Sequence, residues 1–447
     1  MPGFMETIQE VWSQPVNTQD VILRIHVKLI RAAKALRLWK QQNLGNLALR
    51  LAIANEVLPF LDTAQEQRAL TPEELEFRRY LKVKADGLAA IQRSRARQHS
   101  RLTWIRNGDA CTRLFMLHAN NRKRRLHIPS LNTRNSISTN HQQKEEAIYE
   151  HFVNLLGQTQ ERSLSLNWTH LGYHPHDLHE LEDLFEESEI KKVVMQLPAE
   201  KLPGPDDFIG LFYKKCWSII GPDLIAALRA FHSLRTRRIE LINEANIILL
   251  PKKDGAADLS DFRPISLINS LAKIITKLLA DRLAPRMNEL VSGSQNAFIK
   301  KKHCIHDNFV YVQSVIKALH KSKRPALFIK LDISKAFDSL SWVFLLEVMK
   351  ALGFGQKWRD WITTLLATSS SRVLLNGILG KKIQTCSRST SRRSTITITF
   401  YPSHRSPSKN NRAGSPKKRD SLGPPKGGKI KMFPICRLCS PLCKSGP

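Results

Sequence analysis

The carboxylate of Asp332 stands in a nearly all-apolar segment, residues 326–333 (Ala-Leu-Phe-Ile-Lys-Leu-Asp-Ile). This run predicts a strand that is buried on both faces, and a carboxylate at the end of such a strand is costly unless it is paired or binds a cation. Mg²⁺ prefers oxygen ligands, commonly one or two carboxylates together with the phosphates of a substrate. Asp332 is therefore a candidate metal ligand. In the other interpretation, Asp332 caps the following turn and Asp338 caps a helix.

Two cations, Lys252 and Arg263, flank a short turn after a predicted strand. Residues 246–251 (Asn-Ile-Ile-Leu-Leu-Pro) indicate this strand by their length and β-branching. A hairpin at this place could present both cations to one polyphosphate, because Arg offers a bidentate fork and Lys a point charge. The alternative is a basic surface hairpin that binds nothing.

Periodicity and capping signals predict the elements that position these residues. Apolar residues at helical spacing predict a helical region over residues 1–100, in which Thr71-Pro72-Glu73-Glu74 is a capping box. Residues 101–180 have a mixed pattern. Farther along, the sequence predicts helices over 190–197, from about 269 and over 341–352, and strands over 246–251, 326–333 and 372–377. Periodicity stops after about Ile383, and residues 386–447 have the composition of a disordered tail.

Charge is the unusual feature of the composition. The 447 residues contain 70 Lys and Arg against 39 Asp and Glu, a formal net charge of +31. Such a surface attracts polyanions, most commonly nucleic acid, and basic clusters occur at residues 93–97 and 122–125. No apolar run is long enough for a transmembrane helix, and the N-terminus lacks the pattern of a signal peptide. The sequence therefore predicts an intracellular protein, nuclear or cytoplasmic, that does not bind membranes.

Several segments within residues 181–385, taken in order, resemble the reverse transcriptase of non-LTR (LINE-type) retrotransposons, in particular those abundant in plants. The matching segments are 202–206 (Leu-Pro-Gly-Pro-Asp), 250–252 (Leu-Pro-Lys), 261–267 (Asp-Phe-Arg-Pro-Ile-Ser-Leu), 295–299 (Gln-Asn-Ala-Phe-Ile), 305–308 (Ile-His-Asp-Asn), 328–342 (FIKLDISKAFDSLSW) and 358–362 (Trp-Arg-Asp-Trp-Ile). At position 207 the family usually has Gly, whereas this chain has Asp207. Residues 101–180 resemble the region upstream of the polymerase.

The resemblance implies an α+β fold: a helical N-terminal region followed by the fingers and a partial palm of a right-hand polymerase. It makes Asp332 the first ligand of a catalytic Mg²⁺ and the carbonyl of Ile333 a second. It places Phe337 beneath the sugar of the incoming nucleotide, and it assigns Lys252 and Arg263 to its triphosphate. The implied partners are an RNA template, a DNA primer and a dNTP, and the implied chemistry is attack of a primer hydroxyl on the α-phosphate with two metal ions.

The chain departs from the family in its last quarter. The Gly-Leu-Arg-Gln-Gly-Asp-Pro motif and the Tyr-Ala-Asp-Asp hairpin, which supplies further metal-binding carboxylates, are both absent from the sequence. Residues 388–394 can be encoded by codons that, read one nucleotide later, give Gly-Leu-Arg-Gln-Gly-Asp-Pro, and two later stretches behave similarly. We therefore expect a truncated, frameshifted copy in which residues 386–447 are out-of-frame translation.

Two functions from different classes follow from these observations. The first is a reverse transcriptase domain that is catalytically inactive because the second group of palm carboxylates is missing. The second is a non-catalytic, basic nucleic-acid-binding protein, whose affinity should fall steeply with salt. A third interpretation is the product of a pseudogene that does not fold. The oligomeric state and the template are not predicted.

Overall fold

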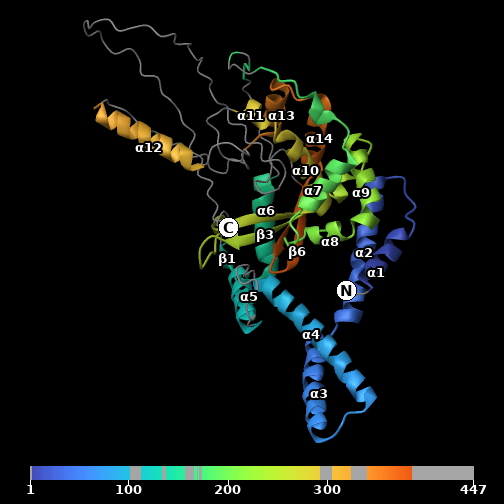
Figure 1. Ribbon diagram of the computed structural model, residues 1–447. Coiled ribbons are helices and arrows are strands. Elements are labelled where there is room, and N and C mark those ends of the chain that lie inside the picture. Colours follow the sequence, from blue (N-terminus) through green and yellow to red (C-terminus); the bar gives the residue numbers. More distant parts are fainter. Residues whose placement is uncertain are drawn as a thin grey trace, which may run out of the picture. The chain divides into compact units, whose positions relative to one another are not determined.

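The computed structural model describes residues 3–100, 112–132, 137–156, 166–168, 170, 174–291, 305–323 and 340–384. These residues form a mostly helical α+β structure with a mixed four-stranded sheet (Figure 1). They divide into two compact units. The sheet unit comprises Met1–Asn154, Phe185–Ile274 and Thr368–Gln384, and the helical unit comprises Leu155–Leu184 and Ile275–Ala367, followed by residues outside the described part.

The first hundred residues are helical, as predicted. The helices are α1 (Phe4–Ser13), α2 (Val21–Leu44), α3 (Leu47–Gln67) and α4 (Pro72–Ser100). Helix α2 begins at Val21 because the carboxylate of Asp20 accepts hydrogen bonds from the backbone N–H groups of Ile22 and Leu23. One face of α2 is buried through Ile22, Ile25 and Leu29, whereas the neighbouring Ile30 is exposed.

The predicted capping box at the start of α4 is confirmed. The hydroxyl of Thr71 accepts a hydrogen bond from the N–H of Glu74, and the carboxylate of Glu74 accepts one from the N–H of Thr71 (2.9 Å). Arg68 adds two hydrogen bonds to the same carboxylate. These contacts satisfy amide groups that a helix start leaves without intrahelical partners.

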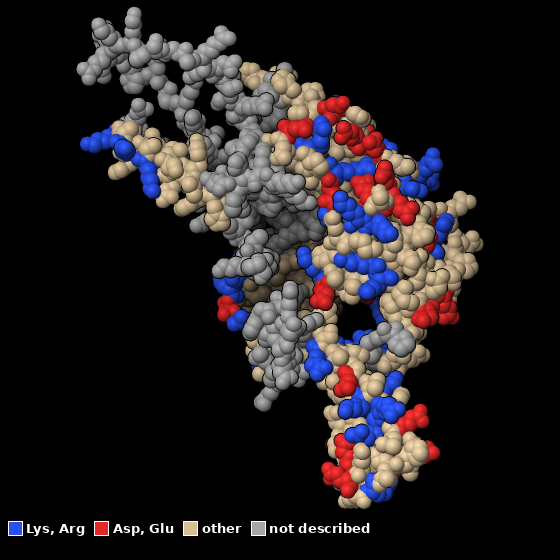
Figure 2. All heavy atoms as spheres, in the orientation of Figure 1, with Lys and Arg blue, Asp and Glu red and all other residues tan. Residues whose placement is uncertain are grey.

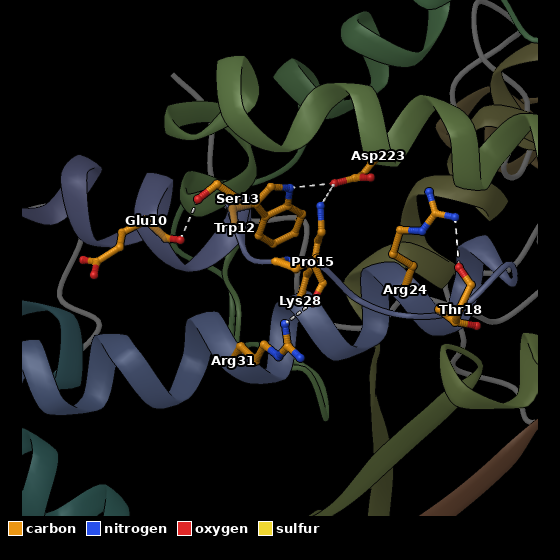
Figure 3. A network of polar contacts seen from close by, with 9 residues as sticks. All are labelled: Glu10, Trp12, Ser13, Pro15, Thr18, Arg24, Lys28, Arg31 and Asp223. Atoms are coloured by element: carbon orange, nitrogen blue, oxygen red, sulfur yellow. Dashed lines mark hydrogen bonds and ion pairs between the residues drawn. The ribbon is translucent and has the colours of Figure 1, made fainter.

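A polar network attaches α1 and α2 to α9 (Trp217–His232). Figure 3 shows the carboxylate of Asp223 on α9 facing the indole of Trp12 and the ammonium of Lys28. Helix α1 is thereby held between α2 and the α9 helix that precedes the sheet. The same view shows Arg31 donating to the carbonyl of Pro15 in the α1–α2 connection.

The sheet has the strand order β4-β3-β5-β6. Its strands are β3 (Glu244–Pro251), β4 (Phe262–Ile268), β5 (Ser370–Leu375) and β6 (Ile378–Gln384). The pairs β3–β4 and β5–β6 are antiparallel hairpins, while β3 and β5 run parallel. The parallel pairing joins two hairpins that are about a hundred residues apart in the sequence, which local sequence patterns do not predict.

One face of the sheet is buried and the other is open. The buried face consists of Ala245, Ile247, Leu249, Phe262, Ile268, Ser371, Val373, Leu375 and Ile383. Helix α6 (His141–Leu156) covers part of it, with Ile148 beside Val373 and Ile383. Ala272, in the first turn of α10 (Ser270–Leu283), packs on Ala245 and Ile268.

Shorter elements of the sheet unit surround these layers. They are α5 (Thr112–Leu126), β1 (Leu131–Asn132), β2 (Ile137–Ser138), α7 (Glu187–Gln196), α8 (Gly210–Lys215) and the 3-10 helices η2 (Ile239–Leu241) and η3 (Leu259–Asp261). Helix α7 ends at Gln196, shortly before Pro198, as the sequence predicts.

The helical unit contains η1 (His179–Glu182), α11 (Met287–Leu290), α12 (Ile305–Lys321), α13 (Trp342–Ala351), α14 (Gln356–Ala367) and the rest of α10. Helix α13 agrees with the helix predicted over 341–352; the hydroxyl of Ser341 caps its start, and Gly353, with a φ of 91°, follows its end. The carboxylate of Glu182 accepts a hydrogen bond from the N–H of Trp358 in the first turn of α14 (2.7 Å). Arg282 donates to three backbone carbonyls of residues 181–184.

Two expectations from the sequence concern a central strand and the absence of a transmembrane helix. The strand predicted over residues 326–333 lies outside the described residues. Among the described residues, the helical stretch Val21–Gln67 is long and apolar enough to cross a membrane by length and composition alone, which is weak evidence. Within this stretch, charged residues such as Arg50 and Glu56 interrupt the apolar runs.

Candidate functional site

The predicted cationic hairpin exists, with Arg263 on β4 and Lys252 directly after the last residue of β3. Arg263 on β4 pairs with Leu250 on β3, and the N–H of Lys252 donates to the carbonyl of Asp261 (2.8 Å), just beyond the last pair of the ladder. Cross-strand partners point to the same face, as do residues two apart on one strand. Arg263 therefore lies on the open face of the sheet, Lys252 lies in the bend that directly follows β3, and both side chains are exposed.

Lys252 and Arg263 form no ion pair with a described residue, whereas the neighbouring Lys253 does. Lys252 donates to the backbone carbonyl of Ser260 (2.5 Å), which leaves its charge without a counter-ion among the described residues. Arg263 has no hydrogen-bond or ion-pair partner within the described part of the chain. Lys253, in contrast, forms an ion pair with Asp261 (3.0 Å), and its hydrogen bond lowers the pKa of that carboxyl. Lys252 and Arg263 thus have the free charges that a polyphosphate would require.

The open face continues across the other two strands. It consists of Glu244, Asn246, Ile248, Leu250, Arg263, Ile265, Leu267, Arg372, Leu374, Leu379 and Lys382, all of them partly or fully exposed. Arg372 on β5 and Lys382 on β6 are direct cross-strand partners. Glu244 is the one acid in this set, and its carboxylate binds Nε of Arg372 at 2.9 Å. Elsewhere the charges mix: Figure 2 shows Lys and Arg interspersed with Asp and Glu over much of the described surface in that view.

The proline-glycine loop at residues 202–206 is anchored at the edge of the sheet. A Cβ on Gly204 would lie 2.2 Å from the carbonyl oxygen of Ile268, so the loop backbone contacts the end of β4 directly. The carboxylate of Asp206 accepts hydrogen bonds from the N–H of Ser270 (3.2 Å) and from the hydroxyl of Tyr213 (3.3 Å). Burial raises the pKa of Asp206 above its ordinary value, while the contacts with Ser270 oppose that shift. The loop therefore joins α8 to the start of α10.

The backbone conformation at position 207 accommodates Asp207 where the resembled family usually has Gly. Asp207 has a φ of 62°, in the left-handed region, where Gly is the residue without steric cost and Asp is among the better-tolerated alternatives. Its side chain forms an exposed ion pair with Arg37 on α2. The substitution is thus compatible with the loop conformation.

Asp332, Ile333, Phe337 and Asp338 lie outside the described residues. Among the described residues there is no group of three or more His, Cys, Asp or Glu side chains that could hold a metal ion. The assignment of Asp332 and Ile333 to Mg²⁺, and of Phe337 to the sugar, stays a prediction.

Sequence reasoning missed three members of this region: Arg372, Lys382 and Asp206. For Arg372 a signal was present, since it lies in a predicted strand next to the Asn376-Gly377 turn, a strong hairpin signal. Strand β6 was not predicted, so Lys382 could not be paired with Arg372. One of the two partners of Asp206 is Ser270, 64 positions away, a contact that no local pattern indicates.

The part of the chain that contains the cationic hairpin is similar to proteins of known family. Residues 250–393 match the family described as reverse transcriptase (RNA-dependent DNA polymerase). This range includes Lys252 and, on the open face, Arg263, Arg372 and Lys382, and it includes Asp332 as well. The resemblance inferred from sequence motifs is thus supported over this segment.

Three relatives illustrate the similarity. The uncharacterized 149 kDa protein of transposon TX1 from Xenopus laevis is 26% identical over 194 residues, which are 42% of this chain and 14% of the relative. The Pol polyprotein of the type-2 retrotransposable element R2DM from Drosophila melanogaster is 33% identical over 121 residues, 27% of this chain and 11% of the relative. The Pol polyprotein of the type-1 element R1 from Bradysia coprophila is 26% identical over 164 residues, 36% of this chain and 16% of the relative.

The chain thus spans no more than about a sixth of the length of these relatives. The similarity extends to elements from three animals. The chain contains a reverse transcriptase domain related to the Pol proteins of non-LTR retrotransposons.

Proposed function

We propose that the open face of the sheet is the substrate face of this reverse transcriptase domain. Its substrates would be an RNA template, a DNA primer and a dNTP, and its lineage would be the non-LTR elements abundant in plants. The observation that supports this proposal best is the placement of Lys252 and Arg263 on one exposed hairpin, inside the segment matched by the reverse transcriptase family.

The two cations would hold the triphosphate of the incoming nucleotide. Arg263 can donate two parallel hydrogen bonds to phosphate oxygens, and Lys252 adds a point charge nearby. The ladder between β3 and β4 is continuous from Ala245 to Phe262. It therefore fixes the backbone of the hairpin, so that little conformational entropy is lost when the phosphates bind.

We propose further that this 447-residue chain does not synthesise DNA. The family mechanism places two metal ions between several carboxylates, and the printed sequence contains no Tyr-Ala-Asp-Asp motif to accompany Asp332. Stabilisation of the developing charge supplies most of the catalysis in phosphoryl transfer, so an incomplete set of metal ligands removes most of the rate.

A frameshift between about Ile383 and Arg388 would explain the missing motifs. It would also explain why residues 381–447 contain 16 Lys and Arg and one acid, Asp420, without periodicity. The nucleotide sequence of the gene tests this part directly. If the +1 frame after codon 383 encodes no polymerase motif, the frameshift hypothesis is wrong.

Two assays of the full chain test the function. In primer extension on an RNA template with Mg²⁺ or Mn²⁺, we expect no template-dependent incorporation, and clear incorporation would overturn the proposed inactivity. In equilibrium binding of a fluorescent dNTP, we expect K252Q and R263Q each to weaken affinity about tenfold, because each removes a charge-assisted hydrogen bond. The matched control is K253Q, since Lys253 is already paired with Asp261. Equal affinities for all variants would refute the triphosphate site.

A second candidate function is non-catalytic binding of nucleic acid. It is favoured by helix α5, which contains no Asp or Glu and ends in Lys123, Arg124 and Arg125, all exposed. The last part of α4, from Gly87 to Ser100, also lacks acidic residues. Salt-dependent RNA binding without any dNTP binding would favour this function over the first.

A further inference from the structure

Arg372 and Lys382 form an unusual cross-strand pair. They are direct partners on neighbouring antiparallel strands, and both lie on the open face of the sheet. Like charges in this position destabilise a sheet unless something compensates them. Glu244 compensates only one of them: it binds Arg372 through Nε, and Lys382 has no ion-pair partner among the described residues.

The pair also sits at an irregularity of the ladder. Between Arg372 and Leu374 the register shifts, and β6 contains one residue more than β5. Bulges of this kind reorient side chains and are common next to functional sites. Here the two lysines of β6 diverge: the N–H of Lys381 and its ammonium contact Glu145 and Glu146 of α6, whereas Lys382 belongs to the open face.

The distance from Arg372 and Lys382 to the cationic hairpin is long enough for several nucleotides of a nucleic-acid strand. Arg263 is opposite Leu250 of β3 and Arg372 is opposite Asn246, and the two cations lie on strands that flank β3. Strand geometry separates them by roughly 13 Å along the sheet and about 10 Å across it, and it places Lys382 one strand farther, about 20 Å from Arg263. One triphosphate does not span such a distance, whereas about six nucleotides of a strand do at a rise of ~3.4 Å each.

We propose that Arg372 and Lys382 bind the phosphate backbone of a single nucleic-acid strand that crosses the open face towards Lys252 and Arg263. Glu244 holds Arg372 through Nε, so its two terminal nitrogens can donate to a phosphate. Lys382 supplies a second phosphate contact, and the phosphates replace the counter-ion that it lacks. This inference rests on the proposed substrate face, and it adds two strands to the part of that face that binds nucleic acid.

The test uses the full chain and a fluorescently labelled 20-nucleotide RNA, with anisotropy measured over a range of salt concentrations. We expect R372Q and K382Q each to weaken binding about three- to tenfold and to reduce the slope of log K against log salt by roughly 0.7, the value for one phosphate contact on a single strand. The matched control is K381Q, the neighbouring lysine whose side chain contacts α6 on the other side of the sheet. It should leave the slope unchanged.

Two further measurements separate the possible outcomes. R372K keeps the positive charge and should retain most of the affinity for RNA. The circular dichroism spectrum of K382Q should equal that of the wild type, since Lys382 has no ion-pair partner among the described residues to lose. Fluorescent dNTP binding should respond to K252Q and R263Q but not to K382Q. If RNA binds and the slope is the same for K382Q, R372Q and wild type, the inference is wrong and the proposed face stands. If the wild-type chain binds neither RNA nor dNTP, both fail.

Discussion

Nζ of Lys28 on α2 lies 2.7 Å from Oδ2 of Asp223 on α9, and the same oxygen accepts a hydrogen bond from Nε1 of Trp12 on α1, also at 2.7 Å. The Lys28 ammonium additionally lies 5.5 Å from the centroid of the Trp12 ring. The side chains of Lys28 and Asp223 are only 14% and 19% exposed. One carboxylate therefore attaches two N-terminal helices to a helix of the segment that leads into the sheet.

Removal of this carboxylate should destabilise the sheet unit. D223A leaves the Lys28 ammonium and the Trp12 N–H without an acceptor in a largely desolvated place, so we expect a loss of about 2 kcal/mol in the free energy of unfolding. D223N keeps an acceptor oxygen for Trp12 and should cost less. Urea denaturation measures both values.

The matched control for this prediction is the Lys277–Asp281 pair in α10, an i,i+4 ion pair whose side chains are more exposed, at 34% and 26%. D281A there should cost about 0.5 kcal/mol. Costs for D223A and D281A that agree within error would show that the Asp223 network contributes no more than a surface pair.

The capping box of α4 should respond to acid. The hydrogen bond from Arg68, together with the N–H of Thr71, lowers the pKa of Glu74 from 4.5 to about 2. Because the folded-state pKa lies below the ordinary value, this contribution is complete above about pH 4.5 and is lost as the pH falls towards 2. Hydrogen exchange of the first-turn amides of α4 should accelerate over that range.

The control for the capping box is E74Q, which keeps an oxygen acceptor but cannot titrate. Exchange of the same amides in E74Q should show no comparable pH step after correction for intrinsic rates. A step of equal size in E74Q would mean that another group causes the acid sensitivity.

The anchored proline-glycine loop leads to a prediction about Asp206. D206A removes the acceptor used by the N–H of Ser270 and the hydroxyl of Tyr213, and we expect a loss of about 1–3 kcal/mol. D206N retains an acceptor oxygen and should cost less. D207N, at the exposed neighbouring position, keeps a residue that tolerates positive φ and should change the unfolding free energy by less than about 0.5 kcal/mol.

The pH dependence of the Asp206 variants has a definite sign. Burial raises the folded-state pKa of Asp206, so its protonated form is favoured in the folded protein and the associated stability declines as the pH rises through that pKa. The unfolding free energy of D206N relative to wild type should therefore increase between pH 4 and pH 7, as measured by denaturation at both values. A relative value that falls over this range would contradict the assignment.

Several elements were predictable because their signals are local. Thr71 and Pro72 start α4, and α13 lies within the predicted range 341–352 and ends before Gly353, as the sequence predicts. Caps and turns depend on hydrogen bonds between residues a few positions apart, and such contacts can be inferred from spacing alone. The strands at 246–251 and 372–377 were recognisable for a similar reason, since β-branched apolar runs that end in turn residues are typical of hairpins.

The amino-acid sequence alone thus determined the helical N-terminal region, several later helices and two strands, and motif order was sufficient to indicate the reverse transcriptase ancestry. Only the tertiary structure decided that β3 lies beside β5, that Arg372 and Lys382 share a face with Arg263, and that Asp223 holds Lys28. These contacts join residues more than a hundred positions apart. Chain closure over such separations costs nearly the same entropy for many alternative pairings, so the choice among them depends on how the assembled layers bury their apolar faces.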